Sequence, residues 1–367
     1  MHPGWLYLLL GSLLLWRIAI PGGKRSSHQN TDRLSIIIPA RNEEKNLHAL
    51  LSSLKAEAAS IHEVIVVDDH SEDETGNIAR NYGMRVIVPP PLPSGWFGKS
   101  WACWNGAKEA DGDVFMFLDA DTTIEPGGVE NILSSRQNSG GALTIQPYHK
   151  ITRVYENLSG MFNLIAVMGI GSFHILSRVI PPAGAFGQCF VCTKKDYEKV
   201  GGHSAISHEI LEHMMLGKTF LNHGIPLRNY IGRQAVSMRM YPGGVKELTQ
   251  GWSKSFASGA GATNLLLLIP IILWVSGSLS AGFSLLGLEG ASGYETAGIL
   301  TLYGLYSIQF YILLRAVGSF IWSASLCFPL LSLFFITVFA YSAIRTFFMK
   351  NVAWKGRSIS LTKKKGR

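Results

Sequence analysis

The sequence has little charge for its length. Only 16% of its 367 residues are Asp, Glu, Lys or Arg, whereas 47% are apolar, and the mean hydropathy is +0.20. Soluble globular proteins carry about a quarter charged residues. The shortage argues against a purely water-soluble enzyme and favours a protein with membrane segments.

Cysteine is also scarce. The four cysteines include a C-x-x-C pair, Cys189 and Cys192, but no second pair completes a structural zinc site. The run 187–193 around the pair is typical of extended chain, which points residues three apart to opposite faces. We therefore expect buried, reduced thiols.

Two common nucleotide-binding motifs are missing. No G-x-G-x-x-G follows the first predicted strand and no Walker A motif is present, so neither a dinucleotide site nor a P-loop site is supported. The net charge of +8 could indicate nucleic acid, but no aromatic-basic stripe accompanies it. The basic residues cluster beside apolar segments, where they would meet anionic lipid head groups. Membrane lipids, and no nucleic acid, are the expected partners.

Apolar residues are concentrated in four segments, residues 5–20, 264–288, 299–314 and 326–344. No Lys or Arg precedes the first segment, whereas Arg17 lies near its end and Lys24, Arg25 and Arg33 follow it. Because positive charge marks the cytoplasmic side, we interpret this segment as an uncleaved anchor, with a signal peptide as the alternative. The segment 299–314 is short and rich in tyrosine, so we interpret it as an interfacial or re-entrant helix. We expect a multi-pass cell-membrane protein with a cytoplasmic catalytic domain.

Short apolar runs alternate with helical patterns between the first two of these segments. The predicted strands span residues 34–38, 63–67, 84–88, 114–118 and 142–146. Asn42 is expected to cap the first helix, and Ser71 with Glu74 to form a capping box on the next. This alternation predicts an α/β fold with a doubly wound, mostly parallel sheet. Ligands bind beyond the carboxyl ends of such strands, where Pro39, Arg41, Glu43, Asp68, Asp69, Asp119 and Asp121 fall.

Asp119 and Asp121 directly follow the buried run 114–118. In extended chain, residues two apart project to the same face, about 7 Å apart along the strand. Two carboxylates there need a nearby cation, and a hard divalent ion that also carries a phosphate meets this need. A polar strand end entering a loop is the alternative. Lys99, at a loop-to-helix junction, could balance a diphosphate, with a solvated lysine as the alternative.

Four motifs occur in an order that resembles the inverting family 2 glycosyltransferases with the GT-A fold: Pro39–Glu44, Val66–Ser71, Gly98–Ser100 and Leu118–Asp121. Later matches resemble one subgroup, the 4,4'-diaponeurosporenoate glycosyltransferases of staphyloxanthin-type carotenoid biosynthesis. These matches are Gln146–His149, Tyr155–Gly169, Ala185–Gly187, Gly201–His203, Arg239–Tyr241, Gln250–Lys254, Ser258–Gly261 and Trp354–Arg357. The resemblance covers nearly the whole chain.

The resemblance implies a UDP-sugar donor, expected to be UDP-glucose, with Mg²⁺ or Mn²⁺ as the cofactor. It assigns the nucleotide to residues at the first two strand ends, namely Pro39, Arg41, Glu43, Asp68 and Asp69. Lys99 would contact the diphosphate. Asp119 would hold the donor ribose or the metal, and Asp121 would be the principal metal ligand. The ion would neutralise charge on the departing UDP.

The family's catalytic base lies in a Glu-Asp pair after a Gly-Gly step. Glu212-His213 stands at that place, with His instead of Asp. We expect Glu212 as the base with His213 beside it, and Glu209 as the alternative base. A weakened base suits a carboxylic acid acceptor, which is already ionised near neutral pH. The family's Gln-x-x-Arg-Trp element is altered too, and Gln250, Trp252 and Lys254 could line the sugar pocket or cover the diphosphate.

These expectations divide the chain into five parts. An N-terminal transmembrane anchor spans residues 1–23, the nucleotide-sugar half of the GT-A domain spans 24–150, and the acceptor-binding half spans 151–262. Membrane helices span 263–345, and a basic cytoplasmic tail spans 346–367. Within the acceptor half, residues 153–176 are expected to form an interfacial helix, with a buried core helix as the alternative.

The sequence thus predicts a membrane-bound inverting glycosyltransferase. It would move a hexose, expected to be glucose, from a UDP-sugar to the carboxylate of an apocarotenoid acid. Another lipid alcohol or a polyprenyl phosphate is the alternative acceptor. The non-enzymatic alternative is a lipid-binding membrane scaffold or a flippase subunit, which would not need the metal site.

Overall fold

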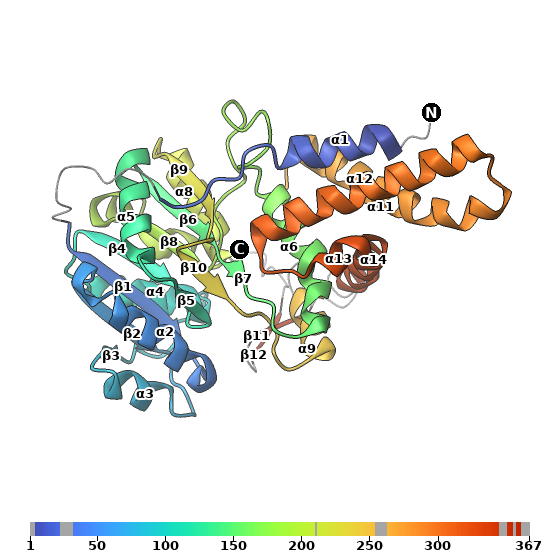
Figure 1. Ribbon diagram of the computed structural model, residues 1–367. Coiled ribbons are helices and arrows are strands. Elements are labelled where there is room, and N and C mark those ends of the chain that lie inside the picture. The colour runs from blue at the N-terminus through green and yellow to red at the C-terminus, as the bar shows by residue number, and fades with distance from the viewer. Residues whose placement is uncertain are drawn as a thin grey trace, which may run out of the picture. The chain divides into compact units, whose positions relative to one another are not determined.

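The computed structural model describes residues 4–22, 32–209, 211–253 and 263–344, together with the backbone of residues 351–354 and 357–360. The chain divides into two units (Figure 1). The sheet unit contains Ile18–His149 and Pro182–Arg239, and the helical unit contains Met1–Arg17, Lys150–Pro181 and Met240–Arg367.

A seven-stranded sheet in the order β3-β2-β1-β4-β8-β6-β9 forms the centre of the sheet unit. Its strands are β1 (Leu34–Ala40), β2 (Glu63–Asp68), β3 (Arg85–Ile87), β4 (Val114–Leu118), β6 (Ala142–Gln146), β8 (Cys189–Thr193) and β9 (Leu227–Ile231). β3, β2, β1 and β4 run parallel, as do β6 and β9, whereas β8 runs antiparallel to both of its neighbours. The prediction of a mostly parallel sheet is therefore confirmed, and the antiparallel strand β8 makes the sheet a mixed one. The carboxyl ends of β1, β2 and β4 meet at one edge.

Helices cover both faces of this sheet. Alternate strand residues point to opposite faces, so Ile36, Val66 and Met116 belong to one core while Ile37, Ile65 and Phe117 belong to the other. The helices are α2 (Glu44–Ala56), α3 (Thr75–Asn81) and α5 (Gly128–Ser139) on the first face, and α4 (Gly98–Glu109), α7 (Lys194–Lys199) and α8 (Glu212–Asn222) on the second. η1 (Ala58–Ser60) and η3 (Gly202–Ile206) are short 3₁₀ turns. The doubly wound arrangement is thus present.

A small second sheet extends the same unit. It contains β5 (Thr122–Ile124), β10 (Val236–Met238) and β7 (Tyr148–His149). β10 pairs antiparallel with β5 and parallel with β7. β5 begins directly after the D-x-D step, so this sheet holds the chain that leaves Asp121.

The N-caps predicted for the first two helices of the sheet unit are wrong, because other residues occupy those positions. Glu43 and Glu74 occupy the N-cap positions of α2 and α3, and neither side chain makes a capping hydrogen bond. The loops after β1 and β2 bind each other instead. Ser71 Oγ accepts a 3.0 Å hydrogen bond from the backbone of Asn42, and Asn42 Oδ1 accepts one of 2.9 Å from Glu72 N–H. Partners from the neighbouring loop therefore satisfy groups that local capping was expected to satisfy.

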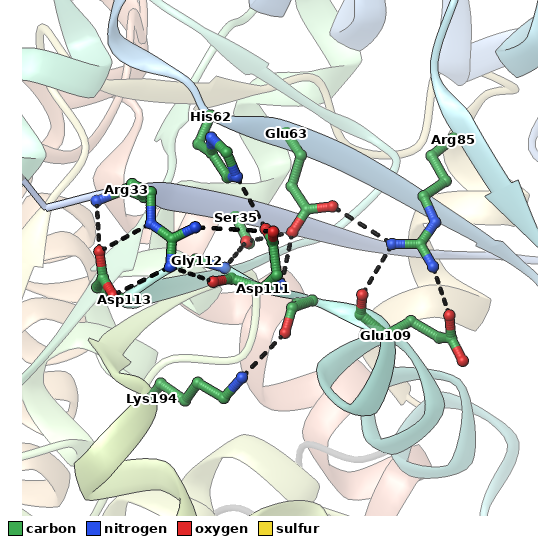
Figure 2. A network of polar contacts seen from close by, with 11 residues as sticks. Arg33, Ser35, His62, Glu63, Arg85, Glu109, Asp111, Gly112, Asp113 and Lys194 are labelled. Atoms are coloured by element: carbon green, nitrogen blue, oxygen red, sulfur yellow. Dashed lines mark hydrogen bonds and ion pairs between the residues drawn. The ribbon is translucent and has the colours of Figure 1, made fainter.

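A polar network joins the opposite edge, at the amino ends of β1, β2 and β4 (Figure 2). Ser35 Oγ donates a 2.6 Å hydrogen bond to Glu63, and the Arg33 guanidinium lies 3.2 Å from the Asp113 carboxylate. His62 lies 2.8 Å from Asp111. Exposed ion pairs contribute little one by one, but together these contacts hold the strand starts in register. Contacts within the chain occupy this edge, whereas the carboxyl edge carries the candidate site residues.

The helical unit contains α1 (Gly4–Leu14), η2 (Val154–Ser159), α6 (Gly160–Gly169), α9 (Val245–Ser253), α11 (Leu265–Phe283), η4 (Ser284–Gly290), α12 (Gly293–Val317), α13 (Trp322–Leu326) and α14 (Phe328–Ile344). β11 (Asn351–Trp354) and β12 (Arg357–Ser360) form a hairpin. Two stretches, Leu265–Gly290 and Gly293–Val317, are long and apolar enough to cross a membrane.

Residues 299–314 do not form a short helix of their own. They lie inside α12, whose 25 residues rise about 38 Å, more than the roughly 30 Å of a bilayer core. A capping box of Ser292 and Glu295 starts α12 before the predicted boundary. The interpretation as a short interfacial or re-entrant helix is therefore wrong in its extent.

The helix expected over residues 153–176 is also shorter. η2 leads directly into α6, which ends at Gly169, and turns follow. Within the helical unit, α6 buries Met161, Phe162 and Leu164 completely. This burial agrees with the buried-core alternative for α6, while the exposed apolar side chains Ile175 and Leu176 lie in the turns.

Gln309 on α12 ties three helices of this unit together. Its Oε1 accepts a 2.8 Å hydrogen bond from Trp274 Nε1 on α11. Its Nε2 donates to the Leu8 carbonyl at 2.8 Å and to Ser12 Oγ at 2.9 Å, both on α1. A buried amide with all these partners is well satisfied in an apolar bundle. The N-terminal helix is therefore an integral part of the helical unit.

Candidate active site

Lys99 is the centre of a charged cluster at the carboxyl edge of the sheet unit. Its Nζ lies 2.7 Å from Asp119 Oδ1 and 3.0 Å from Glu212 Oε1, and it donates a 3.1 Å hydrogen bond to the Gly187 carbonyl. Lys99 stands in the first turn of α4, Asp119 follows β4, and Glu212 begins α8. Three distant segments thus bring one cation and two carboxylates together.

Partial burial strengthens this cluster. The side chains of Lys99, Asp119 and Glu212 are only 19%, 22% and 18% exposed. Burial would lower the pKa of Lys99, but the two carboxylates outweigh it and raise that pKa. Burial would also raise the pKa of Glu212, but the Lys99 ammonium and His213 hold it well below its usual range. Lys99 is therefore charged and Glu212 ionised over the physiological pH range.

The pKa of Asp119 shifts in the opposite direction to that of Glu212. Burial raises its pKa to about 7, with the nearby charges of Asp121 and Glu212 adding to the shift against the opposing effect of Lys99. Thr122 N–H and Oγ1 both donate to the Asp119 carbonyl, at 3.2 and 2.7 Å, and form the tight turn between β4 and β5. This turn carries the partly buried Asp119 and the exposed Asp121.

The donor set of this turn fits a hard divalent cation. Asp119 and Asp121 supply carboxylate oxygens, and such ions complete their coordination with water and substrate phosphate. Mutual repulsion of the two carboxylates contributes to the raised pKa of Asp119, and a bound cation would relieve it. The residues present therefore suit Mg²⁺ or Mn²⁺.

The residues expected to bind the nucleotide lie at the ends of β1 and β2, which are adjacent strands with Ala40 opposite Asp68. Arg41 Nη1 donates a 2.7 Å hydrogen bond to the Asp69 carbonyl. The Asp68 carboxylate accepts a 2.9 Å hydrogen bond from Ser71 N–H and so supports the loop. The structure brings Pro39, Arg41, Glu43, Asp68 and Asp69 to one edge, and their contact with a nucleotide stays a prediction.

His213 lies beside the expected base. Its ring is buried against Phe190, and its Nδ1 lies 3.5 Å from Glu212 Oε1. Burial and the Lys99 charge lower the pKa of His213, so the imidazole is neutral near pH 7. The alternative base Glu209 is paired with His208 at 3.8 Å. Glu212 lies in the Lys99 cluster, and the choice of Glu212 over Glu209 as the base stays a prediction.

Gln250 and Trp252 lie on α9 of the helical unit. Trp252 Nε1 donates a 3.1 Å hydrogen bond to Ser159, and the indole stacks on Phe162 with 5.0 Å between ring centroids. Within its own unit Trp252 is thus a packing residue. Lys254 lies outside the described residues. A role of these three residues at the donor stays a prediction.

The Gly187 carbonyl and Cys103 are site features that the sequence did not indicate. Gly187 belongs to the motif 185–187, which carried the family resemblance without a role, and Cys103 lies one helical turn after Lys99. Helical spacing from Lys99 was the signal that could have identified Cys103.

Comparisons with known proteins identify the family of this chain. Residues 35–201 match the model of the family described as glycosyl transferase family 2. The 4,4'-diaponeurosporenoate glycosyltransferase of Staphylococcus aureus (strain USA300) is 38% identical over 341 residues, which cover 91% of this chain and 90% of that protein. The protein of the same name from strain COL has the same identity and the same coverage of both chains.

Among solved structures, the mannosyltransferase PcManGT from Pyrobaculum calidifontis, in complex with GDP-Man and Mn²⁺, matches 95% of both chains. The TM-score is 0.54 at 13% identity, so this likeness concerns the fold. The predicted family and fold are confirmed, and the non-enzymatic alternative is set aside. The chain belongs to glycosyl transferase family 2 and is a glycosyltransferase with a GT-A fold.

Proposed function

We propose that this chain transfers glucose from UDP-glucose to the carboxylate of an apocarotenoid acid, with inversion at the sugar carbon, and that it does so at a membrane. The observation that carries the proposal is the ion pair between Lys99 and Glu212. It lowers the basicity of the expected base, which suits an acceptor that arrives ionised. The name of the 38% identical relative supports an apocarotenoid acid.

The donor would bind at the carboxyl edge of the sheet unit. Asp119 and Asp121 would hold Mg²⁺ or Mn²⁺, and the bound ion would stabilise negative charge on the leaving diphosphate. Lys99 would add a second positive charge there, because its ammonium is held within 3.0 Å of the Asp119 and Glu212 carboxylates. The residues at the ends of β1 and β2 would contact the uridine. The complex of PcManGT with a nucleotide sugar and Mn²⁺ supports this arrangement on the same fold.

The transfer itself needs little proton movement. A carboxylate oxygen of the acceptor attacks the anomeric carbon, the bond from that carbon to the diphosphate oxygen breaks, and UDP leaves with the electron pair. An alcohol acceptor would also have to lose a proton during the attack, and Glu212 is a poor acceptor for that proton. The product with the acid is a glycosyl ester.

Membrane attachment rests on the helical unit. Leu265–Gly290 and Gly293–Val317 are long enough to span a bilayer, and large apolar side chains on them, including Ile269, Ile272, Ile308 and Ile312, are exposed. Such faces would contact lipid. The basic residues after the first apolar segment support a cytoplasmic sheet unit, which would meet cytoplasmic UDP-glucose.

Membranes containing the chain, incubated with labelled UDP-glucose, would test this function. We expect a labelled lipid when an apocarotenoid acid is supplied, and mild alkali should release the sugar from it. The matched apocarotenoid alcohol should give little product. An alkali-stable product, or equal transfer to the alcohol or to a polyprenyl phosphate, would overturn the acceptor assignment.

A further inference from the structure

Three metal-binding side chains from separate elements converge beside the Lys99 cluster. Cys103 lies on α4, His203 in η3 and His213 on α8. The sulfur and a nitrogen of each ring lie within 4.8 Å of one another. Cys103 and His203 are 0% exposed and His213 is 2% exposed. The three donors therefore form a compact group shielded from solvent.

One ring nitrogen of His203 lacks a hydrogen-bond partner among the described residues. No hydrogen bond reaches His203 Nε2, whereas His213 lies beside Glu212, with 3.5 Å between His213 Nδ1 and Glu212 Oε1, and beside the Gly187 backbone. Most buried polar side-chain atoms do have a partner. Both rings pack against aromatic neighbours. The ring centroids of Phe117 and His203 are 4.7 Å apart, and those of Phe190 and His213 are 6.0 Å apart. Aromatic packing accounts for the ring planes and leaves His203 Nε2 without a partner among the described residues.

The other nitrogen of His203 is already fixed. Its Nδ1 lies 2.9 Å from Tyr197 Oη, and the same oxygen accepts a hydrogen bond of 3.1 Å from the His203 backbone. A histidine that binds a metal commonly has its second nitrogen held in this way, which orients the ring. This contact fixes the His203 ring and leaves Nε2 as the nitrogen available to an ion.

We propose that Cys103, His203 and His213 bind a borderline-soft divalent cation of the Zn²⁺ type. Thiolate and imidazole ligands select such ions, whereas Mg²⁺ and Mn²⁺ prefer the carboxylate oxygens of Asp119 and Asp121. On binding, the Cys103 thiol releases its proton to solvent and the sulfur lone pair forms the bond to the ion.

Metal analysis of the full chain, purified in detergent and loaded with Zn²⁺ in the presence of excess Mg²⁺, tests this site. We expect stoichiometric zinc to remain after dialysis, in wild type and equally in Asp121→Asn. Cobalt replacing zinc should show a thiolate charge-transfer band in the near ultraviolet. Cys103→Ser should lose that band and at least tenfold in zinc affinity. Cys192→Ser, which removes another fully buried thiol, should keep both.

A second measurement covers the case in which Cys103→Ser does not fold. X-ray absorption at the zinc edge of the wild-type chain should show one sulfur and two imidazole ligands. Zinc bound through oxygen or nitrogen alone, no retained zinc, or a cobalt band that persists in a folded Cys103→Ser variant would each overturn the proposal. Because every readout concerns the metal, the result does not depend on whether the chain glucosylates an apocarotenoid acid.

Discussion

Lys99 Nζ lies 3.0 Å from Glu212 Oε1. Lys99 is the residue expected to meet the donor diphosphate, and Glu212 is the expected base, so one ammonium serves both parts of the site. The pairing keeps the Glu212 carboxylate ionised and weakly basic. A base of this kind is sufficient for an acceptor that is already an anion.

Asp121→Asn should abolish transfer. The substitution removes the principal expected metal ligand, and loss of charge stabilisation at a leaving group costs about 10²–10³-fold in rate. Transfer of labelled glucose by membranes would measure the effect. Asp111→Asn, at the opposite edge of the sheet, should leave the rate within about twofold, since exposed pairs contribute little. Retained activity in Asp121→Asn would remove the metal role of this residue.

Glu212→Gln should affect acid and alcohol acceptors differently. With an apocarotenoid acid the rate should fall about tenfold or less, because the nucleophile arrives ionised. Any residual transfer to the matched alcohol should fall by about 10²-fold, the low end of the usual contribution of a general base, because the basicity of Glu212 is lowered. Glu209→Gln is the control and should change neither rate. A large loss with the acid would show that Glu212 does more than accept a proton.

Lys99→Met should weaken donor binding. Loss of a charge-assisted contact to the diphosphate should raise the KM for UDP-glucose by about 10- to 100-fold, and Lys99→Arg should restore part of the loss. Lys108→Met is the matched control, because Lys108 lies on the same helix but over the Trp104 ring. An unchanged KM in Lys99→Met would place Lys99 outside the donor site.

Mn²⁺ should stabilise the protein more at higher pH. The pKa of Asp119 is raised to about 7, so below this pH a proton competes with the ion, by up to about tenfold in affinity per pH unit. Without metal, ionisation of this buried carboxyl destabilises the fold as pH rises from its usual pKa of about 4 to about 7. The rise in Tm caused by Mn²⁺ should therefore be larger at about pH 8 than at about pH 6. Equal shifts at both pH values, or a shift that persists in Asp121→Asn, would contradict this account.

Gly277→Ala should destabilise the helical unit. An added Cβ would lie 2.4 Å from Tyr306 Oη and 2.5 Å from Tyr7 Cβ, in the contact between α11 and its neighbours. Overpacking of this kind costs about 1–3 kcal/mol. Gly304→Ala on α12 is the control, because its Cβ would meet nothing within 4 Å, and a helical alanine is favourable. Unfolding in detergent should separate the two variants, and equal stability would show that α1 does not pack as described.

The sequence alone determined much of the sheet unit. The apolar run 114–118 became β4 with the same bounds, and 142–146 became β6. The four leucines Leu47, Leu50, Leu51 and Leu54, which recur at helical spacing in the sequence, are buried on α2. The C-x-x-C pair lies on the extended strand β8 with both thiols buried. These features depend on local periodicity, which a single sequence contains.

The tertiary structure decided which distant residues meet. β8 enters the sheet antiparallel between β4 and β6, and no local pattern encodes that order. Lys99, Asp119 and Glu212 come together because α4, β4 and α8 pack around one edge, and packing also buries Cys103, His203 and His213 in one group. The D-x-D motif marked the position of a charged site. Its charge balance, with a raised pKa on Asp119 and a lowered one on Glu212, depends on burial and on the shared Lys99 ammonium, and both are properties of the folded chain.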